Sequence, residues 1–185
     1  MAMMPPGFDH FPTLQTGRLS LRAVTDADAT AYRTLLADAE VTAFTDIPDA
    51  PTVKQTQRLI TWMIALFSKR KGCAWAIEYQ DTLIGAIRIN RIHKKERCGI
   101  IGYELSNTHW GQGIMTEALT EVVGQGHTTF DLNRLEAWTS PGNPGSDKVL
   151  LKCGFQYEGT LRQKSHFKGK FQDLRMFGRL QADER

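Results

Sequence analysis

Apolar and polar residues alternate with periods that change several times along the chain, which predicts a mixture of strands and helices. Residues 18–22 alternate with period two, as in a half-buried strand. Thr25 suits a helix N-cap, because apolar residues follow it at helical spacing. Thr52 and Gln55 have the spacing of a capping box, and the amphipathic pattern after them continues as far as Gly72. The chain before residue 73 is therefore predicted to form a strand followed by two helices.

Period two dominates the remainder of the chain, with two interruptions at helical spacing. The predicted strands cover residues 74–77, 83–92, 98–105, 134–139, 157–164 and 171–180, and the predicted helices cover residues 115–123 and 146–153. The first two of these strands and the last two are each close enough to form a hairpin. This order of elements predicts an α+β fold with a mixed sheet. A Pro-rich lead-in over residues 1–12 is expected to be flexible, and residues 13–181 to form a single domain.

Composition narrows the class of protein. Hydrophobic residues make up 41% and charged residues 23%, which excludes collagen-like, coiled-coil and wholly disordered chains. No apolar run approaches the roughly 20 residues of a membrane-spanning helix, and the start of the chain lacks the apolar core of a signal peptide. We therefore expect a cytoplasmic protein without a membrane partner. The three cysteines are widely spaced with no C-x-x-C pair, so neither a metal site nor a redox dithiol is predicted.

The charge of the chain is small but uneven. A net charge of +3 is too low for a generic nucleic-acid binder, so direct DNA binding is not expected. Basic residues outnumber acidic ones between Lys148 and Arg179. This stretch either faces an anion or forms an ordinary solvated surface.

The sharpest chemical signal is a glycine turn over residues 109–116. Gly111 and Gly113 lie directly before a predicted helix, whose first amides and positive dipole end can hold a pyrophosphate. A P-loop would need Lys followed by Ser or Thr after the last glycine, and the dinucleotide fingerprint would need a glycine where Thr116 stands. ATP and NAD are therefore not favoured as ligands. Taken alone, the two glycines are also consistent with a simple tight turn.

Four motifs in sequence carry a resemblance to a known family. They are Gly102-Tyr103-Glu104-Leu105, residues 110–119 from Trp110 to Leu119, residues 143–150 from Asn143 to Leu150, and Gly154-Phe155 with residues 158–162. Together they resemble the GNAT acetyltransferases, of the RimJ/RimL (ribosomal-protein N-terminal acetyltransferase) type. The resemblance implies the GNAT fold, a mostly antiparallel twisted sheet of about seven strands flanked by about four helices.

The resemblance also implies acetyl coenzyme A as the donor and co-substrate. The donor-binding residues it implies are Leu105, Trp110, Gly111, Gln112, Gly113, Ile114, Met115, Thr116 and Asn143. Trp110 stands where Gln or Arg is usual in the superfamily. Met115 stands where a small residue is usual, and its side chain would either crowd the phosphates or turn into the core.

Two residues are candidates for the chemistry. Glu104 could accept the proton of the attacking amine through a water, and Tyr103 would then point to the opposite face of the strand. The alternative is an exposed strand glutamate with no role. Leu150 stands where a tyrosine acid is usual in the family, so Ser146 is the candidate acid. Water is the alternative acid, and helix capping is the structural alternative for Ser146.

The acceptor is predicted from energetics and from the resemblance. Freeing the lone pair of an α-amine at pH 7 costs roughly 3.5 kcal/mol less than for a lysine side chain, from reference pKa values of about 7.7 to 8.0 and about 10.4. The resemblance points to the N-terminal amine of a protein of the ribosomal Ala or Ser type. A small amine (a polyamine, an amino-acid-like toxin or an antibiotic) and a non-catalytic acyl-CoA-binding module are the alternatives. The sequence leaves a monomer and a homodimer equally open.

Overall fold

The protein forms one eight-stranded sheet, seen in a computed structural model that describes residues 7–183. The strands are β1 (Leu14–Gln15), β2 (Leu19–Ala23), β3 (Cys73–Tyr79), β4 (Thr82–His93), β5 (Cys98–Leu105), β6 (Arg134–Thr139), β7 (Gln156–Phe167) and β8 (Lys170–Leu180). Their order across the sheet is β1-β2-β3-β4-β5-β6-β8-β7, and every neighbouring pair is antiparallel except β5 and β6. This architecture confirms the predicted α+β fold with a mixed, mostly antiparallel sheet.

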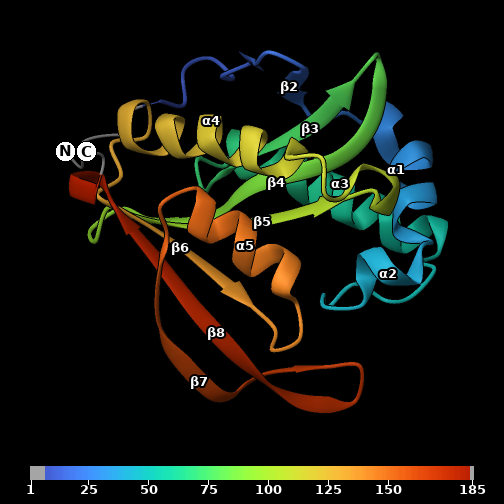
Figure 1. Ribbon diagram of the computed structural model, residues 1–185. Helices are drawn as coiled ribbons and strands as arrows, with labels where there is room; N and C mark the ends of the chain where they lie inside the picture. Colours follow the sequence, from blue (N-terminus) through green and yellow to red (C-terminus); the bar gives the residue numbers. More distant parts are fainter. Residues whose placement is uncertain (1–6, 184–185) are drawn as a thin grey trace.

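Helices cover both faces of the sheet. They are α1 (Ala29–Leu36), α2 (Ala39–Thr42), α3 (Val53–Ser68), α4 (Ile114–Thr128) and α5 (Pro144–Lys152). Helices α4 and α5 lie on one face, and α1 and α3 lie on the other (Figure 1). Strand β4 contributes side chains to the cores on both faces. Ile87 and Ile89 belong to the core under α4, whereas Ala86 belongs to the core under α1 and α3. The small side chain at Ala86 leaves room for the helices on its face.

Local signals in the sequence fix the starts of the helices. The Thr52 hydroxyl accepts a hydrogen bond from the Gln55 amide, and the Gln55 side chain accepts one from the Thr52 amide (2.8 Å), so the predicted capping box is confirmed. Thr25 and Asp28 form a second capping box ahead of α1. Helix α4 starts differently, because its N-cap is Gly113, which has no side chain to accept a hydrogen bond. Its first amides are therefore left for another partner.

The two parallel strands separate, and this separation positions the site. Strands β5 and β6 pair only over four residues each, from Cys98 to Ile101 and from Arg134 to Ala137. Strand β5 then continues to Leu105 with β4 as its partner. The backbone of residues 102–105 consequently has a free edge facing the gap between β5 and β6.

The structure differs from the sequence prediction at the start of the chain. The sheet gains the two-residue strand β1, and the helices gain the short α2, relative to the predicted seven strands and four helices. The segment predicted to be flexible ends at residue 12, but Phe8 within it is buried. Its ring packs against the rings of Phe67 and Phe130, with centroids 5.3 and 5.0 Å away. The buried Trp75 also donates a hydrogen bond to the Pro12 carbonyl. Aromatic burial therefore fixes residues 8–12 on the domain, while residues 1–6 lie outside the described part of the chain.

The buried ring of Phe8 predicts a large effect of its removal. Phe8→Ala should lower the free energy of unfolding by about 3 kcal/mol, because it leaves a cavity among aromatic rings. Phe171→Ala is the matched control, since Phe171 is 67% exposed and its truncation should change stability by less than about 0.5 kcal/mol. Urea denaturation of the two variants measures both values. Equal stability of the two variants would mean that residues 7–12 do not belong to the folded domain.

Candidate active site

The glycine turn forms an open cradle at the start of α4. Gly111 and Gly113 have φ angles of +73° and +75°, which other residues adopt only with strain. A side chain on Gly111 would meet no atom within 4 Å, so the space beside the turn is open. In the described part of the chain, the amides of Ile114, Met115 and Thr116 have no hydrogen-bond acceptor. Three amides and a helix dipole are therefore available to an anion.

Contacts within the turn fix its shape. The Trp110 indole Nε1 donates a hydrogen bond to the Leu105 carbonyl (2.9 Å), which ties the turn to the end of β5. The Gln112 side chain donates to the Thr108 carbonyl (2.9 Å). Met115 is 5% exposed and packs in the core under α4. Its side chain thus turns into the core, and its amide remains at the helix start.

The amide of Leu105 faces the gap between the parallel strands. The Ser106 amide donates to the Ile84 carbonyl (2.8 Å), so Ser106 hydrogen-bonds toward β4. Backbone groups of successive residues in a strand point to opposite edges, so those of Leu105 point away from β4. The bond from Trp110 to the Leu105 carbonyl agrees with this direction. The N–H of Leu105 is therefore placed to donate to an oxygen lying in the gap.

Tyr103 and Glu104 point to opposite faces of β5, as predicted. The Tyr103 hydroxyl donates to the Ser146 carbonyl of α5 (3.3 Å), and burial raises the pKa of Tyr103, which keeps it protonated. Glu104 faces α1, where Tyr32 donates a hydrogen bond of 2.7 Å to its carboxylate. Burial raises the pKa of Tyr32 well above its usual value, and the neighbouring charge of Glu104 raises it further. Tyr32 is therefore a permanent donor to the carboxylate.

Glu104 also forms a buried ion pair that the sequence analysis missed. The Arg88 guanidinium binds both carboxylate oxygens at 2.5 Å, and both side chains are less than a tenth exposed. Gly102 lies opposite Arg88, and a side chain there would come within 2.5 Å of Asn90 and 3.4 Å of Arg88. The sequence feature that could have revealed this pair is an arginine inside the apolar run of β4, because a buried charge needs a partner of opposite charge.

The turn before α5 brings Asn143 and Ser146 together. The Asn143 side chain accepts a hydrogen bond from the Ser146 amide (3.1 Å), so Asn143 caps α5. Ser146 is half-buried, and its hydroxyl has no hydrogen-bond partner among residues 7–183. Leu150 is fully buried in the core, so its position supplies no polar group.

The segment from Asp38 to Pro51, here called the α2 segment, bridges three elements near the end of β5. Asn107, after β5, donates to the Glu40 carboxylate (3.0 Å). Phe44 lies beside Gly142 in the loop after β6. At the tip of the β7–β8 hairpin, Lys168 donates to the Asp49 carboxylate (2.6 Å) and to the Thr42 carbonyl (2.9 Å). The pKa of Asp49 is lowered, chiefly by the hydrogen bond from Lys168.

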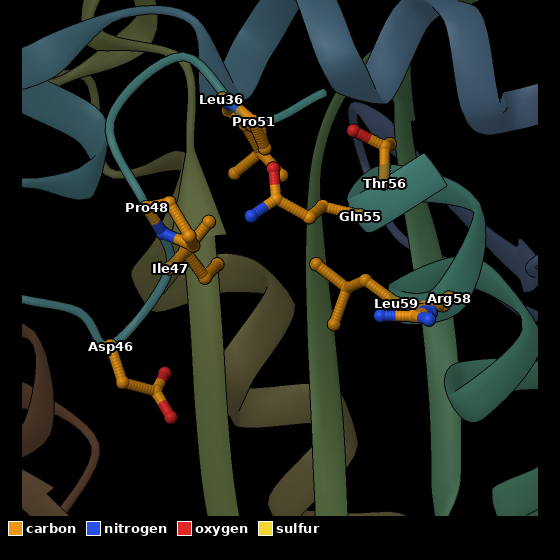
Figure 2. Close-up of a pocket in the computed structure, with 9 residues that line it drawn as sticks. All are labelled: Leu36, Asp46, Ile47, Pro48, Pro51, Gln55, Thr56, Arg58 and Leu59. Carbon is orange, nitrogen blue, oxygen red and sulfur yellow. The ribbon is translucent and has the colours of Figure 1, made fainter. Parts of the chain in front are cut away.

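A cavity of about 260 Å³ lies between the α2 segment and the first turns of α3. Figure 2 shows Gln55 projecting into it between Ile47 and Pro48 on one side and Leu59 on the other. Asp46 and Arg58 are its charged residues, on opposite walls. The cavity contains no residue of the glycine turn and is separate from the cradle at α4.

Other reactive side chains are occupied or buried. His109 shares a hydrogen bond with the Thr108 hydroxyl (3.0 Å). Cys153 is buried, which raises the pKa of its thiol, in line with the role of a small core residue. Among residues 7–183 no three His, Cys, Asp or Glu side chains gather in a way that could hold a metal ion. In the same range no helix has the length and hydropathy needed to span a membrane.

Comparison with known proteins decides the family. The model of the acetyltransferase (GNAT) domain matches residues 18–156. The chain belongs to the GNAT acetyltransferases. An uncharacterized N-acetyltransferase of Bacillus subtilis, YoaA, is 36% identical over 90% of this chain and 96% of its own length. The ribosomal-protein-serine acetyltransferase of Escherichia coli is 29% identical over 69% of this chain and 71% of its own.

The GNAT fold is also confirmed by a solved structure. RimL, described as a ribosomal L7/L12 alpha-N-protein acetyltransferase in complex with coenzyme A, superimposes with a TM-score of 0.84. The match covers 91% of this chain and 98% of RimL, at 22% sequence identity. The match to the family model and the relatives named above confirm the predicted resemblance to GNAT acetyltransferases of the RimJ/RimL type, and the protein is an N-acetyltransferase.

The buried pair in this GNAT acetyltransferase predicts a stability effect that must be separated from catalysis. Glu104→Gln should lower the free energy of unfolding by about 3–5 kcal/mol, because it leaves Arg88 buried without a counter-charge. The double variant Arg88→Met/Glu104→Met should recover most of this loss, since both charges are then absent. Thermal and urea unfolding of the three proteins measure the effect. Equal stability of Glu104→Gln and wild type would contradict the buried pair.

Proposed function

We propose that this protein transfers the acetyl group of acetyl coenzyme A to the N-terminal α-amine of a protein, in the cytoplasm and by direct attack in a ternary complex. The observation that carries the proposal is the free edge of β5 beside the unbonded amides of α4. A donor with an extended arm and a pyrophosphate fits these two features together. The named activities of the ribosomal-protein-serine acetyltransferase and of RimL support the choice of acceptor.

The proposed donor site combines the turn, the strand edge and the start of α5. The amides from Gly111 to Thr116 would hold the pyrophosphate, and the indole of Trp110 and the side chain of Gln112 keep the turn in shape. The pantetheine arm would follow the free edge of β5 as far as Leu105. Asn143 would complete the site through its side-chain amide, since its side-chain oxygen already caps α5.

The proposed chemistry uses groups on both sides of the gap. The Leu105 amide would stabilise the oxyanion that forms on the acetyl carbonyl, a contribution typically of about 10² to 10³ in rate. The Ser146 hydroxyl would pass a proton to the departing thiolate and regain one from solvent water. Glu104 would receive the proton of the amine through a water. Arg88 and Tyr32 occupy three lone pairs of its carboxylate, so one is left for that water.

The proposed acceptor enters from the face that bears Glu104 and the α2 segment. The α2 segment meets Asn107 after β5, Gly142 after β6 and Lys168 at the tip of the β7–β8 hairpin, so it would lie along the acceptor's path. A restricted approach to the site favours an amine at the free end of a chain, which can reach in, over an amine on a folded surface. The lower cost of deprotonating an α-amine favours the same class of acceptor.

An acceptor panel tests the proposed function. Thiol release from acetyl coenzyme A is measured with peptides that begin with Ser or Ala, with the same peptides blocked at the N-terminus but containing lysine, with spermidine, and with an aminoglycoside. Turnover on the free-terminus peptides and not on the blocked ones is expected. Turnover on a small amine alone would replace the proposal with a metabolic or resistance enzyme. Calorimetric binding of coenzyme A without any turnover would favour a non-catalytic acyl-CoA-binding module.

The role of Glu104 is tested in the variant that keeps the fold. Arg88→Met/Glu104→Met removes the carboxylate without leaving a buried charge, so its turnover reports on chemistry. If Glu104 receives the proton, kcat in this variant should fall by about 10² or more at pH 7. A kcat within a few-fold of wild type, at recovered stability, would remove Glu104 from the mechanism and leave it as a structural residue.

A further inference from the structure

The first turn of α4 carries an acidic residue that lies beside the proposed pyrophosphate site. Glu117 stands one residue after Thr116, whose amide is among the unbonded ones. A carboxylate at a helix start is favourable for the dipole but repels a bound phosphate. An uncompensated Glu117 would therefore weaken the anion site that the turn creates.

Arg18 compensates this charge. Its Nε and Nη2 atoms both lie 2.7 Å from the Glu117 carboxylate, and its backbone amide donates a further hydrogen bond of 3.0 Å. The Thr16 hydroxyl donates to the same carboxylate. Partial burial alone would raise the pKa of Glu117, but the bonds from Thr16 and Arg18 outweigh it and lower the pKa. Glu117 is thus a fully ionised, fully paired carboxylate.

The same guanidinium holds the backbone of the turn. Arg18 Nη1 donates to the Gln112 carbonyl at 3.0 Å, and a side chain on Gly113 would lie 3.7 Å from Nη2. The Gln112 carbonyl and the Gly113 N–H belong to one planar trans peptide and point in opposite directions. Helix α4 has β2, which Arg18 precedes, on one side and α5 on the other (Figure 1). Holding the carbonyl on the side of β2 therefore turns the Gly113 amide toward α5 and the gap.

We propose that Arg18 is a positioning residue for the pyrophosphate of the donor. Arg18 cancels the charge of Glu117, so the electrostatic field at the cradle comes from the amides of the first turn. It also directs the Gly113 amide into the cradle. The inference rests on the proposed donor site and extends it to a residue before β2, in a segment to which sequence analysis gave no role in the site. Its ligand class is a pyrophosphate ester with an acyl-thioester arm.

The test compares donors with and without the pyrophosphate. Arg18→Gln should raise the Kd of coenzyme A, measured by titration calorimetry, by about tenfold. Its kcat/KM for S-acetyl-pantetheine, which carries the same thioester without the pyrophosphate, should stay within about twofold of wild type. Equal losses with acetyl coenzyme A and S-acetyl-pantetheine, or an unchanged Kd for coenzyme A, would overturn the inference.

Charge variants separate the two parts of the role. Glu117→Gln should lower the Kd of coenzyme A about threefold, and Arg18→Gln/Glu117→Gln should return to within about threefold of wild type, because the repelling charge is gone. Arg18→Lys keeps the charge and should recover part of the affinity. No recovery in the double variant would contradict the electrostatic part and overturn the proposal as stated.

Two glycine variants distinguish failure of this inference from failure of the donor site. Gly113→Ala forces a strained φ into the cradle and should weaken coenzyme A, whereas Gly124→Ala, in mid-helix with open space around it, should not. If Gly113→Ala weakens binding and Arg18→Gln does not, only the role of Arg18 is overturned. If neither weakens binding, the proposed pyrophosphate site itself is wrong.

Discussion

The separation of β5 from β6 is the constraint on which the rest of the site depends. Two parallel strands that pair over four residues and then diverge leave one strand edge without partners inside the protein. Unpaired backbone groups are costly when buried, so this edge is stable only if it stays open to solvent or a ligand. Helices α4 and α5 both begin beside the gap (Figure 1), which adds two helix dipoles and the unbonded amides of α4 to the same place.

The two faces of β5 have different chemistry because of strand alternation. Tyr103 faces α5, and Glu104 faces α1, where the buried pair with Arg88 connects β4 to β5. Burying this pair costs desolvation free energy. What the pair contributes is a fixed position of the Glu104 carboxylate against Tyr32. A carboxylate held this firmly suits a relay through water better than direct contact with a mobile amine.

The start of α4 shows how one helix end is kept positive in spite of an acid in its first turn. The segment before β2 uses Thr16 and Arg18 to saturate Glu117, so that the acid anchors the N-terminal strands to α4. Arg18 also donates a hydrogen bond to the Gln112 carbonyl, which holds the conformation of the glycine turn. Anchoring of the sheet edge and shaping of the cradle are therefore one set of interactions.

The sequence by itself determined the family and the main elements, without the short β1 and α2. Periodicity, the N-cap at Thr25, the capping box at Thr52 and the glycines before α4 are local features, and local geometry depends on neighbouring residues. The motifs in sequence indicated a GNAT acetyltransferase, and the donor-site residues that they imply stay a proposal. Tertiary structure alone decided which charges meet: Arg88 with Glu104, Arg18 with Glu117 across 99 positions, and Lys168 with Asp49 across 119. Such pairs depend on strand order and register, which place distant residues side by side and which no local pattern in the sequence contains.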